Sequence, residues 1–172
     1  MPSRQPAASS RNVASEIVLR AARAGEADIL TALCMRSKAR WGYDSDFMRL
    51  SRSSLTVDEA DIVAGRVLVA EREGQPIGMA EVAADGELDK MFVDPSVLGQ
   101  GVGQTLFKAA VSLARRLGAE RMAILADPNA AAFYERMGAR FVRHAPSDAI
   151  PGRTLPLYEY DLMPGAADSP PA

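Results

Sequence analysis

A glycine-rich segment carries the strongest chemical signal in the chain. Leu98-Gly99-Gln100-Gly101-Val102-Gly103-Gln104 lies between an apolar run that ends at Val93-Asp94-Pro95 and a stretch with helical periodicity. Glycines at alternate positions remove side chains where the backbone turns into the helix, and the free N–H groups at a helix start attract negative charge. The segment therefore predicts a binding site for a phosphate or pyrophosphate group.

The spacing of the glycines excludes two common phosphate-binding loops. A dinucleotide fingerprint that begins at Gly99 needs a glycine at position 104, where the chain has Gln104. A nucleoside-triphosphate loop needs Gly-Lys-Ser or Gly-Lys-Thr, and Gly103-Gln104-Thr105 has no lysine. On the glycines alone, a tight strand-to-helix turn that binds nothing stays open as the alternative.

A second strand-to-helix unit follows further along the chain. Arg121–Ala126 is typical of a buried strand, and Asp127-Pro128 has the residue types preferred at a helix N-cap and first helical position. The predicted helix contains Phe133-Tyr134 and ends at Gly138. The chain therefore contains two strand-to-helix units in succession.

These two units, V-D-P-x-x-x-G-x-G-V-G-x-x-L and then D-P-x-A-x-x-F-Y-x-x-x-G, resemble the motifs of the GNAT superfamily of acetyl-CoA dependent N-acetyltransferases, in a bacterial-type form. The resemblance covers residues 16–162 and is specific because both motifs occur in order. It implies an α/β (α+β) fold with a mixed, mostly antiparallel sheet of about six or seven strands and about four flanking helices. The central parallel strands, here Glu87–Val93 and Arg121–Ala126, would splay apart.

The same resemblance implies where acetyl-CoA would bind. The glycine-rich turn would cradle the pyrophosphate, the Val93 amide would stabilise the oxyanion and Tyr134 would protonate the departing thiolate. Leu98 departs from the family pattern, which has Arg or Gln there, and Asp127 replaces a common asparagine, so that Asn129 is the preferred pantetheine contact. The implied cofactor-binding residues are Met91, Phe92, Val93, Leu98, Gly99, Gln100, Gly101, Val102, Gly103, Gln104, Asp127, Asn129 and Tyr134.

Amine attack on a thioester needs a neutral amine, so a base or a water chain must remove a proton. Glu87 and Asp89 are two residues apart, so their side chains point to the same side of the strand. Glu87 also lies where some superfamily members keep a catalytic glutamate. The equally weighted alternative is that Glu87 and Asp89 are solvent-exposed carboxylates of the strand without a catalytic role. Glu81 on the preceding strand is a third candidate base, whereas His144 is more typical of a surface residue.

The acceptor would be recognised where the superfamily varies most. Trp41 and Tyr43 lie at a break between two predicted helices, with Asp44 or Ser45 as the N-cap of the second, and Ser147 and Arg153 lie in the last loop. Trp41 as a core residue and Arg153 as a purely structural residue are the alternatives. The expected substrate-binding residues are Trp41, Tyr43, Glu81, Ser147 and Arg153.

Composition bounds the remaining possibilities. The 172 residues fit one domain, and 20 Lys and Arg against 22 Asp and Glu disfavour nucleic acid as a partner. A single cysteine, Cys34, predicts a small core residue, and with one histidine it offers no metal cluster. We expect disordered tails at residues 1–15 and 164–172, a domain at 16–163, no membrane span and a cytoplasmic location.

The expected function is transfer of the acetyl group of acetyl-CoA to a primary amine, by direct attack in a ternary complex. A small-molecule amine is the favoured acceptor, because the Trp41 and Arg153 segments would narrow the site. The alternatives are a protein or peptide amine acetyltransferase and a non-catalytic acyl-CoA-binding sensor or interaction module. A homodimer is possible on the resemblance.

Overall fold

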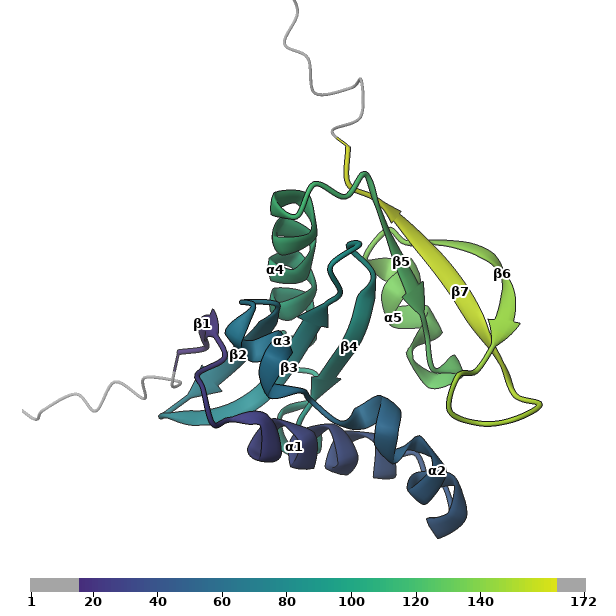
Figure 1. Cartoon of the computed structure of the whole chain (residues 1–172), viewed down its shortest axis with the longest axis horizontal. Helices are drawn as coiled ribbons and strands as arrows, with labels where there is room; N and C mark the ends of the chain where they lie inside the picture. The colour runs from purple at the N-terminus through teal and green to yellow at the C-terminus, as the bar shows by residue number, and fades with distance from the viewer. Residues whose placement is uncertain (1–15, 164–172) are drawn as a thin grey trace, which may run out of the picture.

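The computed structural model describes residues 16–163, and the expected tails at 1–15 and 164–172 lie outside them (Figure 1). The amino-terminal half contains β1 (Val18–Ala21), α1 (Ala27–Ala39), α2 (Ser45–Leu55), α3 (Glu59–Val63), β2 (Val67–Arg72), β3 (Gln75–Val82) and β4 (Leu88–Val93). The second half contains α4 (Val102–Arg116), β5 (Arg121–Leu125), α5 (Ala131–Arg136), β6 (Arg140–Pro146) and β7 (Thr154–Asp161). Short 3₁₀ turns, η1 (Pro95–Val97) and η2 (Pro128–Ala130), precede α4 and α5.

The strands form two antiparallel sheets rather than one continuous sheet. The first sheet has the order β1-β2-β3-β4, and the second has the order β5-β7-β6. Between them, β4 and β5 run in the same direction and diverge toward their carboxyl ends (Figure 1). The expected mixed fold with a splayed parallel pair is confirmed. The helix α3 is an addition to the expected elements, because five residues are too few to show helical periodicity in the sequence.

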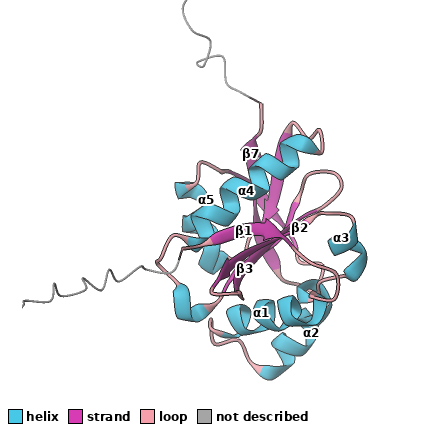
Figure 2. Ribbon diagram, turned by 90° about the vertical axis from the view of Figure 1, so that its left-hand side faces the viewer, coloured by secondary structure: helices cyan, strands magenta, loops and turns pink. Residues whose placement is uncertain are grey.

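Helices cover both faces of the first sheet (Figure 2). On one face, α1 and the segments after it enclose a core that includes Leu30, Leu33 and the buried Cys34. On the other face, α4 packs through Leu106 and Ala110 into a larger core that reaches the second sheet. Cys34 is a core residue as expected, and burial raises the pKa of its thiol to about 12. Within residues 16–163, no helix combines the length and apolar character needed to span a membrane.

The close approach of α4 to β3 depends on Gly78. A Cβ atom at this position would lie 2.8 Å from the Leu106 side chain and 3.0 Å from that of Val102. Glycine therefore lets the first turns of α4 rest directly on the strand. This contact fixes where the helix begins, and with it the glycine-rich turn that precedes the helix.

Side-chain caps start several of these elements. The Asp44 carboxylate accepts a hydrogen bond from the Phe47 amide at 2.8 Å, so Asp44 rather than Ser45 is the N-cap of α2. Asp94 and Asp127 accept in the same way from the amides two residues later, at the starts of η1 and η2. In both turns proline follows the aspartate, which ends the preceding strand because proline has no N–H to donate.

A buried ion pair joins β3 to β4. Glu81 and Lys90 are paired in the strand register, and Glu81 Oε2 lies 3.2 Å from Lys90 Nζ. Lys90 also donates to Asp89 at 2.5 Å, and among residues 16–163 no hydrogen bond of good geometry reaches Glu81 Oε2. Burial raises the pKa of Glu81 to about 7, against the opposing attraction of Lys90.

This pKa predicts a pH-dependent stability. Glu81 holds its proton more tightly in the folded state than in the unfolded state. Its protonation therefore stabilises the fold fully below pH 4.5, and this stabilisation is lost as the pH rises toward 7. In urea unfolding, the free energy of unfolding of Glu81→Gln should therefore rise by about 2–3 kcal/mol relative to that of wild type as the pH goes from 5 to 8. Glu120→Gln, which changes an exposed glutamate, should gain nothing, and equal behaviour of the two variants would contradict the assignment.

Candidate active site

A cavity of about 1000 Å³ opens where β4 and β5 diverge. One wall is the whole of β4 and the glycine-rich turn, and the facing wall is the end of β5 with the start of α5. The end of α1 and residues 147–149 of the β6–β7 loop complete the rim. The two motifs, separate in the sequence, therefore lie on opposite sides of one cavity.

The cavity-facing edge of β4 has unpaired backbone groups. Within the described residues, hydrogen-bonded strand pairing joins β4 to β3 alone and does not join it to β5. The Asp94 amide donates to the Ile77 carbonyl, so in antiparallel alternation the amides of Met91 and Val93 point the other way, into the cavity. Phe92, the third residue expected to bind pantetheine, directs its backbone toward Met79, and its side chain lines the cavity.

The glycine-rich turn is shaped for a ligand on its outer side. Gly99 and Gly101 have φ values of 76° and 83°, a left-handed conformation that other residues rarely adopt, and a Cβ at either would meet open space. Gly103 differs, because a Cβ there would lie 3.3 Å from the Phe133 ring. The amides that start α4 remain accessible for an anion, and most of the expected turn residues line the cavity: Leu98, Gly99, Gly101, Val102, Gly103 and Gln104.

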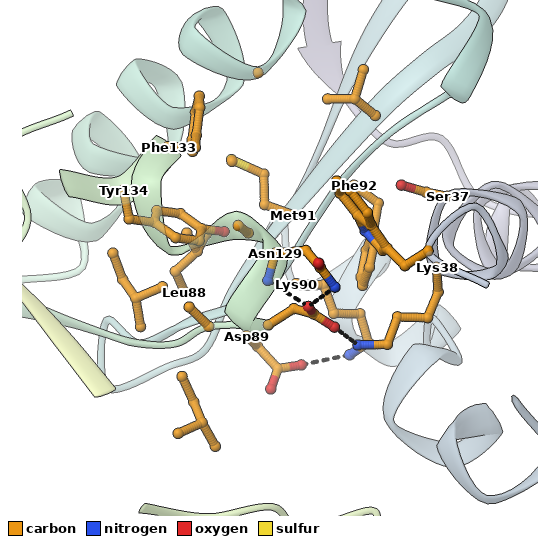
Figure 3. Close-up of a pocket in the computed structure, with 18 of the residues that line it drawn as sticks. Ser37, Lys38, Leu88, Asp89, Lys90, Met91, Phe92, Asn129, Phe133 and Tyr134 are labelled. Carbon is orange, nitrogen blue, oxygen red and sulfur yellow. Dashed lines mark hydrogen bonds and ion pairs between the residues drawn. The ribbon is translucent and has the colours of Figure 1, made fainter. Parts of the chain in front are cut away.

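Tyr134 projects from α5 into the cavity. Tyr134 is 6% exposed and its ring packs against Phe107 and Phe133, and its hydroxyl points into the cavity toward β4 (Figure 3). Burial, helped by the negative charge of Asp127, raises the pKa of Tyr134 above its ordinary value. The phenol is therefore protonated at any physiological pH and is placed to act as an acid.

Of the candidate bases, Glu87 and Asp89 lie at the cavity wall, as their alternation suggested. Burial and the neighbouring Asp85, Asp89 and Asp148 raise the pKa of Glu87, which makes it a better proton acceptor than an exposed glutamate. Glu81 is buried and is not among the lining residues. His144 lies on the exposed side of β6, with its ring 5.3 Å from that of Phe141.

A charged and aromatic group, which we call the Asp127 cluster, connects three distant segments beside the cavity. Asp127 accepts hydrogen bonds from Lys38 at 2.5 Å, from the Tyr43 hydroxyl at 2.9 Å and from the Asn129 side chain at 2.9 Å. Arg153 donates to the Tyr43 hydroxyl at 2.9 Å and lies 3.7 Å from Asp127. Burial alone would raise the pKa of Asp127, but the bonds from Lys38, the Asn129 amide and Tyr43 outweigh it and lower the pKa.

The expected acceptor-binding residues fall into two groups. Trp41, which is 44% exposed, and Ser147 line the cavity directly. Tyr43 and Arg153 stand behind the lining residues Asp127 and Asn129, with Tyr43 stacked on Phe47 at 3.9 Å. Tyr43 is thus more than a rim residue, because it links the α1–α2 connection to the last loop.

Lys38, Lys90 and Phe133 also line the cavity, although none of them is among the site residues expected from the sequence. Phe133 lies within the second motif, next to Tyr134, and this position in the motif could have indicated that it lines the site. Lys38 and Lys90 carry no such signal, since their roles depend on Asp127 and Glu81, which only the folded chain brings near them.

Comparisons with known proteins agree with this geometry. The model of the Acetyltransferase (GNAT) family matches residues 35–139. The chain is 28% identical over 142 residues to the peptidyl-lysine N-acetyltransferase YjaB of Salmonella typhimurium, covering 82% of this chain and 94% of that protein.

Solved structures show the same fold. A GCN5-related N-acetyltransferase from Rhodopseudomonas palustris has a TM-score of 0.71 at 25% identity, over 86% of this chain and 96% of that chain. The PaiA N-acetyltransferase of Thermoplasma acidophilum, solved with coenzyme A, has a TM-score of 0.68 at 16% identity, over 85% of this chain and 99% of that chain. The chain is therefore an acyltransferase that belongs to the GNAT family of N-acetyltransferases.

Proposed function

We propose that this protein transfers the acetyl group of acetyl-CoA to the primary amine of a small molecule, by direct attack in a ternary complex. The observation that carries the proposal is the unpaired edge of β4, which faces the Tyr134 hydroxyl across the cavity and leads into the glycine-rich turn. An extended amide chain, a phosphate group and a leaving group that needs a proton would each find a matching partner there.

The cavity fits acetyl-CoA in three parts. The amides of Met91 and Val93 can donate to an amide-containing arm laid along β4, as a neighbouring strand would. The start of α4 and the open space above Gly99 and Gly101 suit a pyrophosphate. Acetyl-CoA, when bound, supplies an activated acetyl group as a thioester.

The residues around that position have distinct tasks. Glu87 or Asp89, directly or through water, takes a proton from the acceptor ammonium, so that the neutral nitrogen can form the new C–N bond. The Val93 amide stabilises negative charge on the acetyl oxygen. Tyr134 would give its hydroxyl proton to the sulfur as the C–S bond breaks, and the phenol would regain a proton from the nitrogen, which loses its second proton as the amide forms. The products are free CoA and the N-acetylated acceptor.

The Asp127 cluster supports a small acceptor. It ties α1 and the α1–α2 connection to the end of β5 and to the β6–β7 loop, which narrows the acceptor side of the cavity. Its two cations, Lys38 and Arg153, share one carboxylate, Asp127, so one positive charge of the cluster is left for a negative group. The carboxylates Glu87, Asp89 and Asp148 line the same cavity and suit the ammonium of the acceptor. This arrangement favours a small amine that also carries a negative group.

A second candidate function is acetylation of lysine side chains in proteins. The likeness to YjaB, which is named a peptidyl-lysine N-acetyltransferase, favours it. The two candidates differ in the acceptor, so one assay separates them.

That assay is calorimetric titration with acetyl-CoA, followed by free-thiol release across amino acids, polyamines, aminoglycosides and lysine peptides. We expect acetyl-CoA to bind and free amines of low mass to release thiol faster than peptides do. Faster release with peptides would favour the second function, and binding without release from any amine would leave a sensor of acyl-CoA. Failure to bind acetyl-CoA would overturn the proposal.

Tyr134→Phe tests the proton donor. The variant should lower kcat by about ten- to a hundredfold at unchanged affinity for acetyl-CoA, because it removes an acid and no hydrogen bond within the described residues. Tyr158→Phe is the matched control. Tyr158 is also buried, its hydroxyl donates to Glu135 at 2.8 Å, and it does not line the cavity. The control variant should lose stability and keep its kcat. Full activity of Tyr134→Phe would remove Tyr134 from the mechanism.

Gly101→Ala tests the phosphate-binding turn. Gly118, beyond the other end of α4, has the same left-handed backbone with a φ of 85° and the same open surroundings, so Gly118→Ala carries the same strain without the site. Both variants should lose about 1 kcal/mol of stability in urea unfolding. Calorimetry should show weaker acetyl-CoA binding for Gly101→Ala alone, by about tenfold or more. Equal affinities would place the phosphates elsewhere.

A further inference from the structure

Arg72 connects the end of β2 to the glycine-rich turn. Its Nη1 donates to Gln100 Oε1 at 2.7 Å, across 28 positions of sequence. Gln100 lies between Gly99 and Gly101, and it is exposed and outside the cavity lining. The contact therefore reaches the turn through a side chain that does not line the cavity.

Folding alone does not account for the placement of this guanidinium. No carboxylate of residues 16–163 forms an ion pair with Arg72, and its Nε is buried without a hydrogen-bond partner. A buried donor left unpaired is unfavourable, so such a group calls for another explanation. Among residues 16–163, the one side-chain hydrogen bond of Arg72 is the bond to the turn.

The turn itself needs an external restraint. Two glycines in the left-handed region flank Gln100, and glycine loses more conformational freedom on ordering than any other residue. Leu98, at the first position of the turn, is apolar and 40% exposed, so it contributes no polar contact to hold the backbone. A turn that must present its amides to an anion gains affinity when it is ordered beforehand.

We propose that Arg72 is a positioning residue of the phosphate site, which acts through Gln100 to hold the glycine-rich turn in the conformation that binds the pyrophosphate of CoA. This inference rests on the proposed function and adds a residue from outside both sequence motifs. Arg72 orders the turn and leaves the pantetheine-binding edge of β4 unaffected.

The experiment compares two ligands, CoA and pantetheine, which lacks the pyrophosphate. CoA affinity is measured by calorimetry and the weaker pantetheine affinity by NMR titration, for wild type, Arg72→Met, Arg72→Lys, Gln100→Ala and the double variant Arg72→Met/Gln100→Ala. Arg140→Met, which removes an exposed arginine of β6, is the control for loss of one positive charge.

Arg72→Met and Gln100→Ala should each weaken CoA binding by about tenfold, and the double variant by no more than either alone, because both break one interaction. Arg72→Lys, which keeps a donor, should stay within about threefold of wild type, and pantetheine affinity should change by less than about twofold throughout.

Several results would overturn the inference. Unchanged CoA affinity in Arg72→Met does so, as does an additive double variant or an equal loss for pantetheine, which would indicate general damage to the fold. Gln100→Ala, an exposed change, keeps the test valid if Arg72→Met fails to fold. Failure of wild type to bind CoA would instead refute the proposed function, so the two failures are distinguishable.

Discussion

The active site depends on one constraint, which is that two adjacent parallel strands do not pair. Because β4 and β5 belong to separate sheets, the amides of Met91 and Val93 lose the partners that a continuous sheet would provide. Unpaired backbone groups are costly unless water or a ligand satisfies them. The split therefore reduces the stability of the ligand-free sheet and creates a template for an extended amide chain. The cavity, the exposed turn and the access of Tyr134 to it all follow from this split.

Local chemistry directs both strands out of the sheet in the same manner. Each ends at an Asp-Pro pair, in which proline ends the strand and aspartate caps a 3₁₀ turn that leads toward a helix. The repeated device brings the start of α4 and the start of α5 to the same cavity from opposite walls. Gly78 then sets the position of α4 on β3, because a side chain there would push the helix away. The geometry of the turn is thus set from within the first sheet.

What the sequence could reveal follows from how far the interacting residues lie apart. The glycine-rich turn, the Asp-Pro caps and Tyr134 depend on neighbours within a few positions, and the fold and the walls of the cavity were predicted from them. The pairs Lys38–Asp127 and Arg72–Gln100 are set by packing of distant elements, so residue type and local spacing carry no trace of them. The Glu81–Lys90 pair depends on the register of two neighbouring strands. Glu81 shows the difference, since strand position made it a candidate base and the packing of α1 buried it away from the cavity wall.

Asp127 links the Asp127 cluster to Tyr134, the proton donor that we propose. Lys38, the Asn129 amide and Tyr43 keep its carboxylate ionised despite burial, and its charge helps burial to raise the pKa of Tyr134. A phenol of raised pKa does not protonate the very weakly basic sulfur of an intact thioester, whereas the thiolate that forms as the C–S bond breaks is a much stronger base than that sulfur. In the proposed mechanism, proton transfer from Tyr134 would therefore follow the first formation of the bond to the acceptor nitrogen. A change at Lys38 or Tyr43 would alter this timing without touching the reacting atoms, because the cluster sets the charge that Tyr134 experiences.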